Sequence, residues 1–144
     1  MKKFTFEGRL VQALVTDIYD GDTVTIVFFN GNEPVKYSFR MLGYDAPEVK
    51  PKKITENYDL HKRAGQVARD KLQSEIEKGQ NMVWIKFSKE EKYGRLMGKM
   101  YKVDEDNLTQ FKGDEICLND WMVEQGYGMS YDGGKKGEFT LENL

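Results

Sequence analysis

The chain has 144 residues, of which 39% are hydrophobic and 12% are aromatic. This apolar content can fill one core, so we expect one folded domain rather than two. The formal net charge of −2 excludes the strongly basic surface of a protein that coats nucleic acid, so any contact with nucleic acid must be local or assisted by a metal ion. Cys117 is the only cysteine, which excludes an internal disulfide framework.

The first residues do not have the pattern of a secretory signal. Glu7, Arg9 and Asp17 interrupt every apolar stretch that follows Lys2 and Lys3. No segment approaches the roughly 20 apolar residues that a helix needs to cross a bilayer. We therefore expect a soluble, cytoplasmic protein with no membrane partner, or a secreted one if a leader was removed before residue 1.

Three strands are expected in the first third of the chain. An apolar run from Phe4 to Ile18 is followed by Asp20-Gly21, a typical hairpin turn. The next strand is predicted from Thr23 to Phe29, and the third, after a turn at Asn30-Gly31-Asn32, from Val35 to Leu42. In the third strand one face carries the apolar residues Tyr37, Phe39 and Met41, and the other carries Lys36, Ser38 and Arg40. Arg40 should therefore point away from the apolar face.

The rest of the chain predicts two helices and two more strands. Gly43 to Tyr58 contains Pro47 and Pro51 and should be a loop. Helical spacing predicts a helix, ended by Gly79, and a short second helix capped by Asn119. The expected elements are the helix His61 to Lys78, the strands Met82 to Phe87 and Leu96 to Val103, and the helix Asp120 to Gln125.

The order of these elements favours an α+β fold that is mainly β. Three strands, a helix, two strands and a short helix, with connections taken to be short and antiparallel, suggest a five-stranded OB-type closed barrel with two packed helices. Because one fold can serve many functions, the candidate site has to be argued from its own residues.

Asp22 is the first candidate site residue. It shares the parity of Val24 and Ile26, so its carboxylate should lie at the rim of the core, where a charge must be compensated. A bound cation would compensate it, and Asp45 could supply a second oxygen ligand. Oxygen ligands without a His or Cys cluster suit Ca²⁺ better than zinc. Asp-Gly is also a common hairpin turn, so a purely structural role remains open.

Glu48 and two arginines extend the candidate site. Pro47 would fix the Glu48 carboxylate relative to Asp45, where it could take a proton from water. Arg40 and Arg95 could bind phosphate oxygens in pairs, because the guanidinium is planar and always charged. The alternative is that both arginines are solvated or pair with Glu48 and Asp45.

Taken together, these segments resemble the thermonuclease, or staphylococcal-nuclease-like, family. The resemblance runs from about Leu10 to about Tyr131 and rests on a combination of short motifs. It implies an OB-fold barrel with helices and hydrolysis of DNA and RNA phosphodiester bonds, with Ca²⁺ as the cofactor. The motifs are Asp20-Gly21-Asp22-Thr23, the segment Arg40 to Glu48, Tyr93-Gly94-Arg95, and the segment Leu118 to Tyr127.

The resemblance also implies roles for individual residues. Asp22, Asp45 and the backbone carbonyl of Ala46 would hold Ca²⁺, and Ala46 stands where the family often has Thr. Glu48 would be the general base, while Arg40 and Arg95 would bind the scissile phosphate and stabilise its transition state. The substrate-binding residues would be Lys53, Lys92, Tyr93 and Tyr131.

The end of the chain departs from the family pattern. Family members usually continue into a long basic helix, whereas this sequence has a Gly- and Lys-containing tail. We therefore expect a nuclease-like domain over residues 1–131 and a tail over residues 132–144, without the family's long C-terminal helix. The expected function is that of a Ca²⁺-dependent, monomeric nuclease acting on DNA, RNA or both. The alternatives are a catalytically weak or inactive nucleic-acid-binding module and a calcium-stabilised structural domain.

Overall fold

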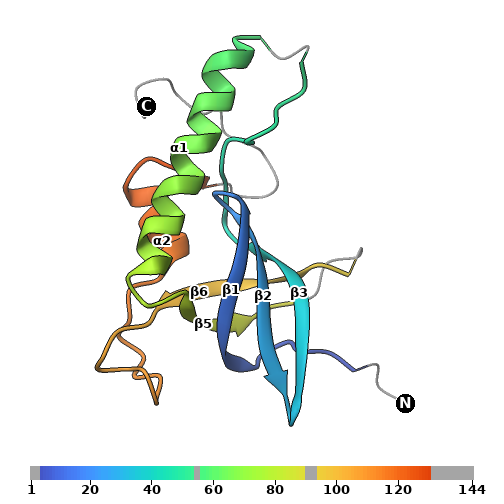
Figure 1. The fold of residues 1–144 in the computed structure, drawn as a ribbon, viewed down its shortest axis with the longest axis vertical. Helices are drawn as coiled ribbons and strands as arrows, with labels where there is room; N and C mark the ends of the chain where they lie inside the picture. The colour runs from blue at the N-terminus through green and yellow to red at the C-terminus, as the bar shows by residue number, and fades with distance from the viewer. Residues whose placement is uncertain (1–3, 54–55, 90–93, 131–144) are drawn as a thin grey trace.

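The computed structural model describes residues 4–53, 56–89 and 94–130. Five strands close a barrel in the order β1-β2-β3-β6-β5, and two helices lie beside it (Figure 1). The prediction of a mainly β, α+β fold with a five-stranded OB-like barrel is confirmed. The barrel strands are β1 (Leu10–Asp20), β2 (Thr23–Asn30), β3 (Glu33–Met41), β5 (Met82–Phe87) and β6 (Leu96–Lys102). The helices are α1 (Tyr58–Glu77) and α2 (Leu118–Glu124).

The barrel closes through a parallel pair, which the sequence analysis did not expect. Phe39 of β3 pairs with Leu96 of β6, and Arg40 with Met97, with both strands running in the same direction. The other four pairings are antiparallel. A parallel pair requires a long crossover connection, and here the chain between β3 and β6 includes α1 and β5. This pairing places Arg40 beside the start of β6, and Arg95 is the residue immediately before that strand.

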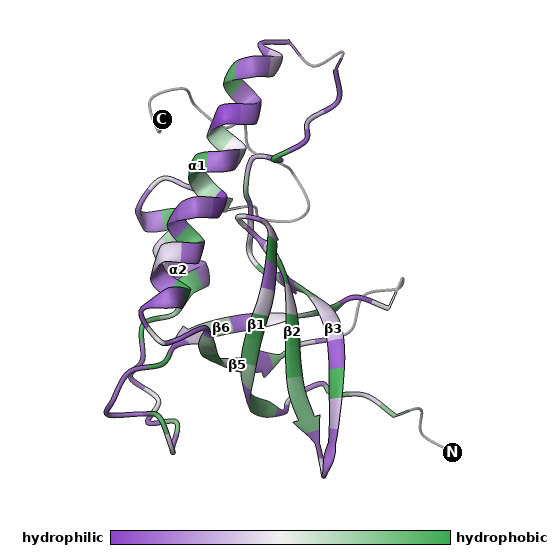
Figure 2. Ribbon diagram, in the orientation of Figure 1, coloured by the Kyte–Doolittle hydropathy of each residue, from purple (hydrophilic) through white to green (hydrophobic). Residues whose placement is uncertain are grey.

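Strand alternation fills the barrel interior. Val24, Ile26 and Phe28 of β2 are at most 2% exposed, and Phe39 and Met41 of β3 are fully buried. Figure 2 shows the corresponding hydrophobic residues along β1 and β2. Because the side chains of a strand alternate between its two faces, the same pairing turns Thr23, Thr25, Ser38 and Arg40 to the outer face of the sheet. The predicted alternation of the third strand is thus confirmed.

Helix α1 packs one apolar stripe against the barrel. Ala64, Ala68, Leu72 and Ile76 recur every four residues and are at most 2% exposed, which is the spacing of one helix face. The helix begins at Tyr58, three residues before the predicted start, after Asn57 in a left-handed conformation with φ of 56°. No side-chain cap marks this start, which is why the sequence pattern placed it too late.

Asn119 lies inside α2 and does not cap it. The helix begins at Leu118, and Asn119 is 3% exposed. Its Oδ1 accepts a hydrogen bond from the Met100 N–H at 2.9 Å, and its Nδ2 donates to the carbonyls of Leu42 and Gly98 at 2.8 and 3.1 Å. The predicted cap was therefore wrong, because the Asn119 amide bonds residues of the barrel and of the loop after β3 instead of the N–H groups at the start of the helix.

A small second sheet joins the loop after β3 to the segment after α2. Strand β4 (Tyr44–Asp45) pairs antiparallel with β7 (Met129–Ser130). The predicted tail over residues 132–144 and the expected lack of a long C-terminal helix lie outside the described residues. Within the described part of the chain, no helix is long and apolar enough to span a membrane.

Candidate active site

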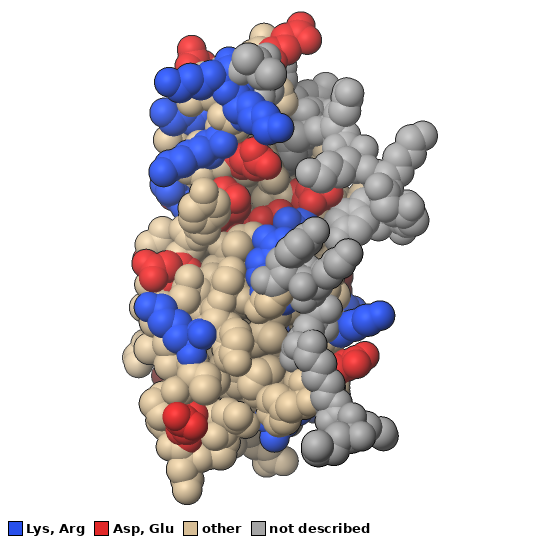
Figure 3. Space-filling view, turned by 90° about the vertical axis from the view of Figure 1, so that its right-hand side faces the viewer, with Lys and Arg blue, Asp and Glu red and all other residues tan. Residues whose placement is uncertain are grey.

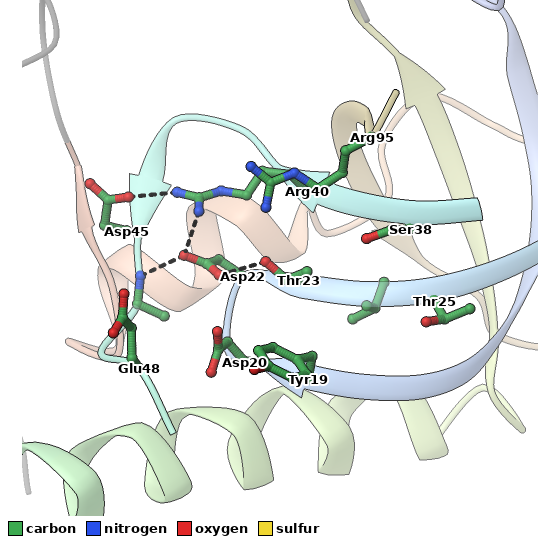
Figure 4. A pocket seen from close by; sticks show the side chains of 12 residues that line it. Tyr19, Asp20, Asp22, Thr23, Thr25, Ser38, Arg40, Asp45, Glu48 and Arg95 are labelled. Carbon is green, nitrogen blue, oxygen red and sulfur yellow. Dashed lines mark hydrogen bonds and ion pairs between the residues drawn. The ribbon is translucent and has the colours of Figure 1, made fainter. Parts of the chain in front are cut away.

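A pocket of about 430 Å³ lies where the β1–β2 turn meets the end of β3 and the loop that follows it (Figure 4). The predicted residues Asp22, Arg40, Asp45, Glu48 and Arg95 all line it, although they come from four separate segments. The fold therefore brings the predicted catalytic residues to one place. The full lining is Tyr19, Asp20, Asp22, Thr23, Val24, Thr25, Ser38, Arg40, Asp45, Ala46, Glu48 and Arg95.

The β1–β2 turn is held tightly against its neighbours. A Cβ atom on Gly21 would lie 2.9 Å from the Cβ of Ala68, which is too close, so the approach of α1 to this turn requires glycine. The buried hydroxyl of Tyr44 donates a hydrogen bond to the Gly21 carbonyl at 2.6 Å. These contacts fix the backbone next to Asp22, so the position of its carboxylate is set by the barrel.

The Asp22 carboxylate is 4% exposed and accepts three contacts. The Thr23 hydroxyl donates to Oδ1 at 2.9 Å, the Ala46 N–H donates to Oδ2 at 2.9 Å, and Arg40 Nη1 lies 3.3 Å from Oδ2. The predicted inward position of Asp22 is confirmed. The structure adds that Arg40 supplies a positive charge against this carboxylate, a role that the sequence analysis gave to a bound cation.

Arg40 bridges the two acids that were predicted to hold the metal. Its Nη2 lies 2.5 Å from Asp45 Oδ1 and donates to the Tyr44 carbonyl at 3.1 Å. The side chains of Arg40 and Asp45 are 18% and 20% exposed. The pairing of Arg40 with Asp45, which the sequence analysis kept as an alternative, is therefore present.

The loop that carries Glu48 is tied to β1 and α1. The Val49 N–H donates to Asp20 Oδ1 at 2.9 Å, and a Cβ on Gly65 of α1 would collide with the backbone carbonyl of Glu48. The Glu48 side chain is exposed and lines the pocket. A rigid backbone thus presents a solvent-accessible carboxylate toward the same space as Asp22.

Asp20 is a fourth acid in the pocket that the sequence analysis quoted but did not assign. Burial raises the pKa of its carboxyl group, and the nearby Asp22 and Glu48 carboxylates raise it further. The hydrogen bond from Val49 and the charge of Arg40 act in the opposite direction but do not cancel the rise in pKa. Its shared parity with Asp22 across Asp20-Gly21-Asp22 was the signal that could have identified it.

The pocket carries an excess of negative charge. Its lining contains the four carboxylates of Asp20, Asp22, Asp45 and Glu48 and the two guanidiniums of Arg40 and Arg95, which leaves a formal charge of −2 when all are ionised. Figure 3 shows acidic side chains in a hollow of this face, with basic side chains above and below them. A pocket with this balance would repel a phosphate unless a cation also bound there.

The donor set fits a hard divalent cation. The charged donors in the pocket are carboxylate oxygens, and neither histidine nor cysteine lines it, which suits an oxygen-coordinated ion such as Ca²⁺. Among residues 4–53, 56–89 and 94–130, no three His, Cys, Asp or Glu side chains are grouped as a metal site. A cation would therefore need backbone carbonyl or water oxygens in addition to two acids, as the predicted set of Asp22, Asp45 and the Ala46 carbonyl provides.

Of the four predicted substrate-binding residues, only Lys53 belongs to the described part of the chain. Lys53 is exposed in the loop between β4 and α1 and does not line the pocket. Lys92, Tyr93 and Tyr131 lie outside the described residues. Tyr19, Thr25 and Ser38 line the pocket but were not proposed from the sequence, because only the pairing of β1, β2 and β3 brings them to one surface.

One comparison with known proteins identifies the family of this chain. A family model described as staphylococcal nuclease homologue matches residues 38–142, which include Arg40, Asp45, Glu48 and Arg95 but not Asp22. No curated protein matches the chain. Because the family match covers most of the 144 residues, and the barrel agrees with it, the chain belongs to the staphylococcal nuclease homologue family.

Proposed function

We propose that this protein is a Ca²⁺-dependent nuclease that hydrolyses phosphodiester bonds of DNA, RNA or both. One observation carries the proposal: Arg40 and Arg95 share a pocket with four carboxylates, giving a formal charge of −2. Arginines suit a phosphate, and the acid excess suits a cation that would accompany it. Membership in the staphylococcal nuclease homologue family supports the same reaction.

Asp22, Asp45 and the backbone carbonyl of Ala46 would hold Ca²⁺. When bound, a divalent cation supplies Lewis-acid polarisation of the phosphate and offsets the charge that develops on its oxygens. Asp22 is fixed by the Thr23 hydroxyl and the Ala46 N–H, so part of this donor set is already oriented. Asp45 remains 20% exposed and can meet a ligand from solvent.

Glu48 would act as the general base. Its carboxylate is exposed in the pocket, where a water molecule can reach it. The Val49–Asp20 hydrogen bond fixes the adjacent backbone, so the base is presented from a defined position. General base catalysis contributes about 10²-fold to 10⁴-fold, which is too little for phosphodiester cleavage and requires a second contribution.

The two arginines would supply that second contribution. A guanidinium can donate two parallel hydrogen bonds to phosphate oxygens, and one arginine can contribute about 10³-fold to 10⁵-fold in phosphoryl transfer. Asp22 and Asp45 orient Arg40, while Arg95 enters the pocket from the start of β6. Lys53, Lys92, Tyr93 and Tyr131 would contact the rest of the substrate, and no protein partner is required.

The pairing of Arg40 favours a second candidate function. Two acids and the Tyr44 carbonyl already contact its guanidinium, which lowers the charge it can offer a transition state, as in a catalytically weak or inactive nucleic-acid-binding module. The two functions differ in what they require of Glu48. A nuclease needs its carboxylate as the base for cleavage, whereas a binding module needs no base.

A cleavage assay separates these two functions. Single- and double-stranded DNA and RNA are incubated with Ca²⁺ or with chelator, using the wild type, Glu48→Gln and the matched control Glu105→Gln, whose carboxylate is exposed in a distant loop. We expect Ca²⁺-dependent cleavage that falls about 10²-fold to 10⁴-fold in Glu48→Gln and stays unchanged in Glu105→Gln. Cleavage in chelator, or full activity of Glu48→Gln, would contradict the mechanism.

A further inference from the structure

Tyr19 is an exposed aromatic residue at the edge of the pocket. Its side chain lines the pocket and is 61% exposed, and Figure 4 shows its ring beside Asp20. Ile18 pairs with Val24 and Asp20 with Thr23, so Tyr19 stands opposite no residue of β2. Such a β-bulge redirects the side chain of the extra residue. The bulge thus places a large apolar ring in solvent next to an acid-rich pocket.

Two hydroxyl groups connect Tyr19 to the arginine end of the pocket. Thr25 of β2 pairs with Ser38 of β3 on the outer face of the sheet, and both residues line the pocket. Ser38 lies two residues before Arg40, so the hydroxyl pair is about 7 Å along the strand from the proposed phosphate-binding arginine. The pocket therefore continues past the proposed phosphate position onto a surface with an aromatic edge and two hydroxyls, beside which Asp17 of β1 pairs with Thr25.

We propose that Tyr19, Thr25 and Ser38 form a subsite for the nucleotide next to the scissile phosphate, with its base stacked on Tyr19. This inference rests on the proposed nuclease function. The two hydroxyls suit the uncharged polar groups of a sugar and base edge better than a second phosphate, which would need a cationic side chain. Aromatic rings stack any unpaired base with little preference for its identity.

The subsite predicts a preference for single strands. A base in a duplex is stacked between its neighbours and paired, so it must leave the helix before it can lie on Tyr19, which costs free energy. A single-stranded base has no such cost. Removing the ring should therefore weaken binding of single strands more than binding of duplexes of the same sequence.

The test measures the coupling between Tyr19 and one base of the substrate. Dissociation constants are measured calorimetrically with Ca²⁺ for single-stranded trithymidylate and for analogues lacking one base at each position, using the non-cleaving Glu48→Gln background. With Tyr19 present, we expect removal of the base at one position to weaken binding about 5-fold to 100-fold. With Tyr19→Ala, that loss should shrink to about twofold or less, and Tyr19→Phe should restore it.

A control and a second readout separate this subsite from general effects. Phe29→Ala removes an aromatic side chain of similar exposure, 68%, on β2 outside the pocket, and it should leave the base dependence intact. In the cleaving enzyme, Tyr19→Ala should raise KM with kcat nearly unchanged, because stacking binds substrate and transition state equally.

The outcomes distinguish the subsite from the proposed function. Equal losses on base removal with and without Tyr19 would overturn the subsite, even if the wild type cleaves nucleic acid. Tyr19-dependent binding by a wild type that does not cleave would support the subsite and overturn the nuclease function. Failure of the Glu48→Gln protein to bind the trinucleotide would overturn the subsite, and the cleavage assay would then decide the nuclease function separately.

Discussion

Asp22 and Asn119 are both buried polar residues, yet their surroundings differ in charge. Asn119 is 3% exposed, and its neutral amide bonds the Met100 N–H and the carbonyls of Leu42 and Gly98. Asp22 is 4% exposed and equally well bonded, but it lies in a pocket with an excess of carboxylates. The first arrangement is complete by itself and holds α2 against the barrel. The second sets four carboxylates against two guanidiniums, which is the imbalance that the proposed cation would offset.

A buried polar residue can serve stability or function, and the charge of its surroundings separates the two cases. A neutral, satisfied polar group lowers the free energy of the fold, because its loss would leave buried partners unsatisfied. A cluster of like charges raises the free energy of the fold until a cation binds. Substitutions near Asn119 should therefore affect unfolding, whereas those in the pocket should affect turnover and ligand response.

Arg95→Lys should give the largest effect in the comparison. Lysine keeps the charge but cannot bind two phosphate oxygens with one planar group, so we expect kcat to fall about 10³-fold. The Ca²⁺ dissociation constant should stay nearly unchanged, since Arg95 is not a proposed ligand. Arg40→Lys should lose as much kcat, while Arg9→Lys at the other end of β1 should lose none. Unchanged kcat in both pocket variants would make the arginines incidental.

Asn119→Ala should have the opposite effect, because it should reduce the free energy of unfolding and leave turnover unchanged. The change removes the partner of the buried Met100 N–H and of the Leu42 carbonyl, while the Gly98 carbonyl still accepts the Leu42 N–H, so the free energy of unfolding should fall by about 2 to 3 kcal/mol. Urea denaturation measures this loss, and Asp120→Ala on the exposed face of α2 serves as the control. Turnover per folded molecule should remain near wild type at a temperature where the variant is folded. A stable variant with poor turnover would assign Asn119 to the site instead.

Ca²⁺ should stabilise the wild type through the acid-rich pocket. At a concentration 100 times its dissociation constant, a ligand that binds only the folded state adds about 2.7 kcal/mol to the free energy of unfolding. Asp45→Asn should lose most of this gain, whereas Asp114→Asn, an exposed acid that does not line the pocket, should keep it. Thermal unfolding with Ca²⁺ and with chelator tests this, and an equal gain in both variants would place the ion elsewhere.

Asp20→Asn should give the smallest effect, a gain in stability without Ca²⁺. The pKa of Asp20 is raised in the folded state by burial and by Asp22 and Glu48, so the folded protein binds its proton more tightly than the unfolded chain. The stability that this tighter proton binding contributes to the wild type is therefore lost as pH rises from the ordinary aspartate pKa through the raised one. Above that window the variant should be more stable by less than about 1 kcal/mol, because the group is partly exposed and screened.

The pH dependence provides the check on Asp20→Asn. Urea denaturation in chelator should show the difference between variant and wild type at neutral pH and its disappearance below the ordinary aspartate pKa. Asn can still accept the Val49 N–H, so the loop carrying Glu48 keeps its tie to β1. A difference that persists at low pH would attribute the gain in stability to something other than charge.

Much of this fold was predictable because it depends on local patterns. Period-two alternation placed Asp22 inward and Arg40 outward, and both assignments hold in the structure. The start of α1 was placed three residues late, since the sequence offers no side-chain cap there. The parallel β3–β6 pairing was missed because residues far apart in the chain form it, and neither strand's own sequence specifies its partner.

The candidate site divides in the same way. Sequence motifs picked out the acids and arginines of a candidate phosphate and cation site, and the fold brings them into one pocket. The motifs could not show that Arg40 contacts both Asp22 and Asp45, since those contacts depend on the register of β2 with β3 and on the path of the loop through β4. They gave Asp20 no role and did not include Tyr19, because the turn and the bulge are what bring these two residues to the pocket.

The sequence by itself determined the strand faces, the family resemblance and the chemical types of the site residues, because each follows from side-chain chemistry and spacing along one segment. Only the tertiary structure decided which charges meet. Closure of the barrel brings four carboxylates and two guanidiniums from separate segments into one pocket, and the strength of a charge interaction depends on separation in space, which spacing along the chain does not give.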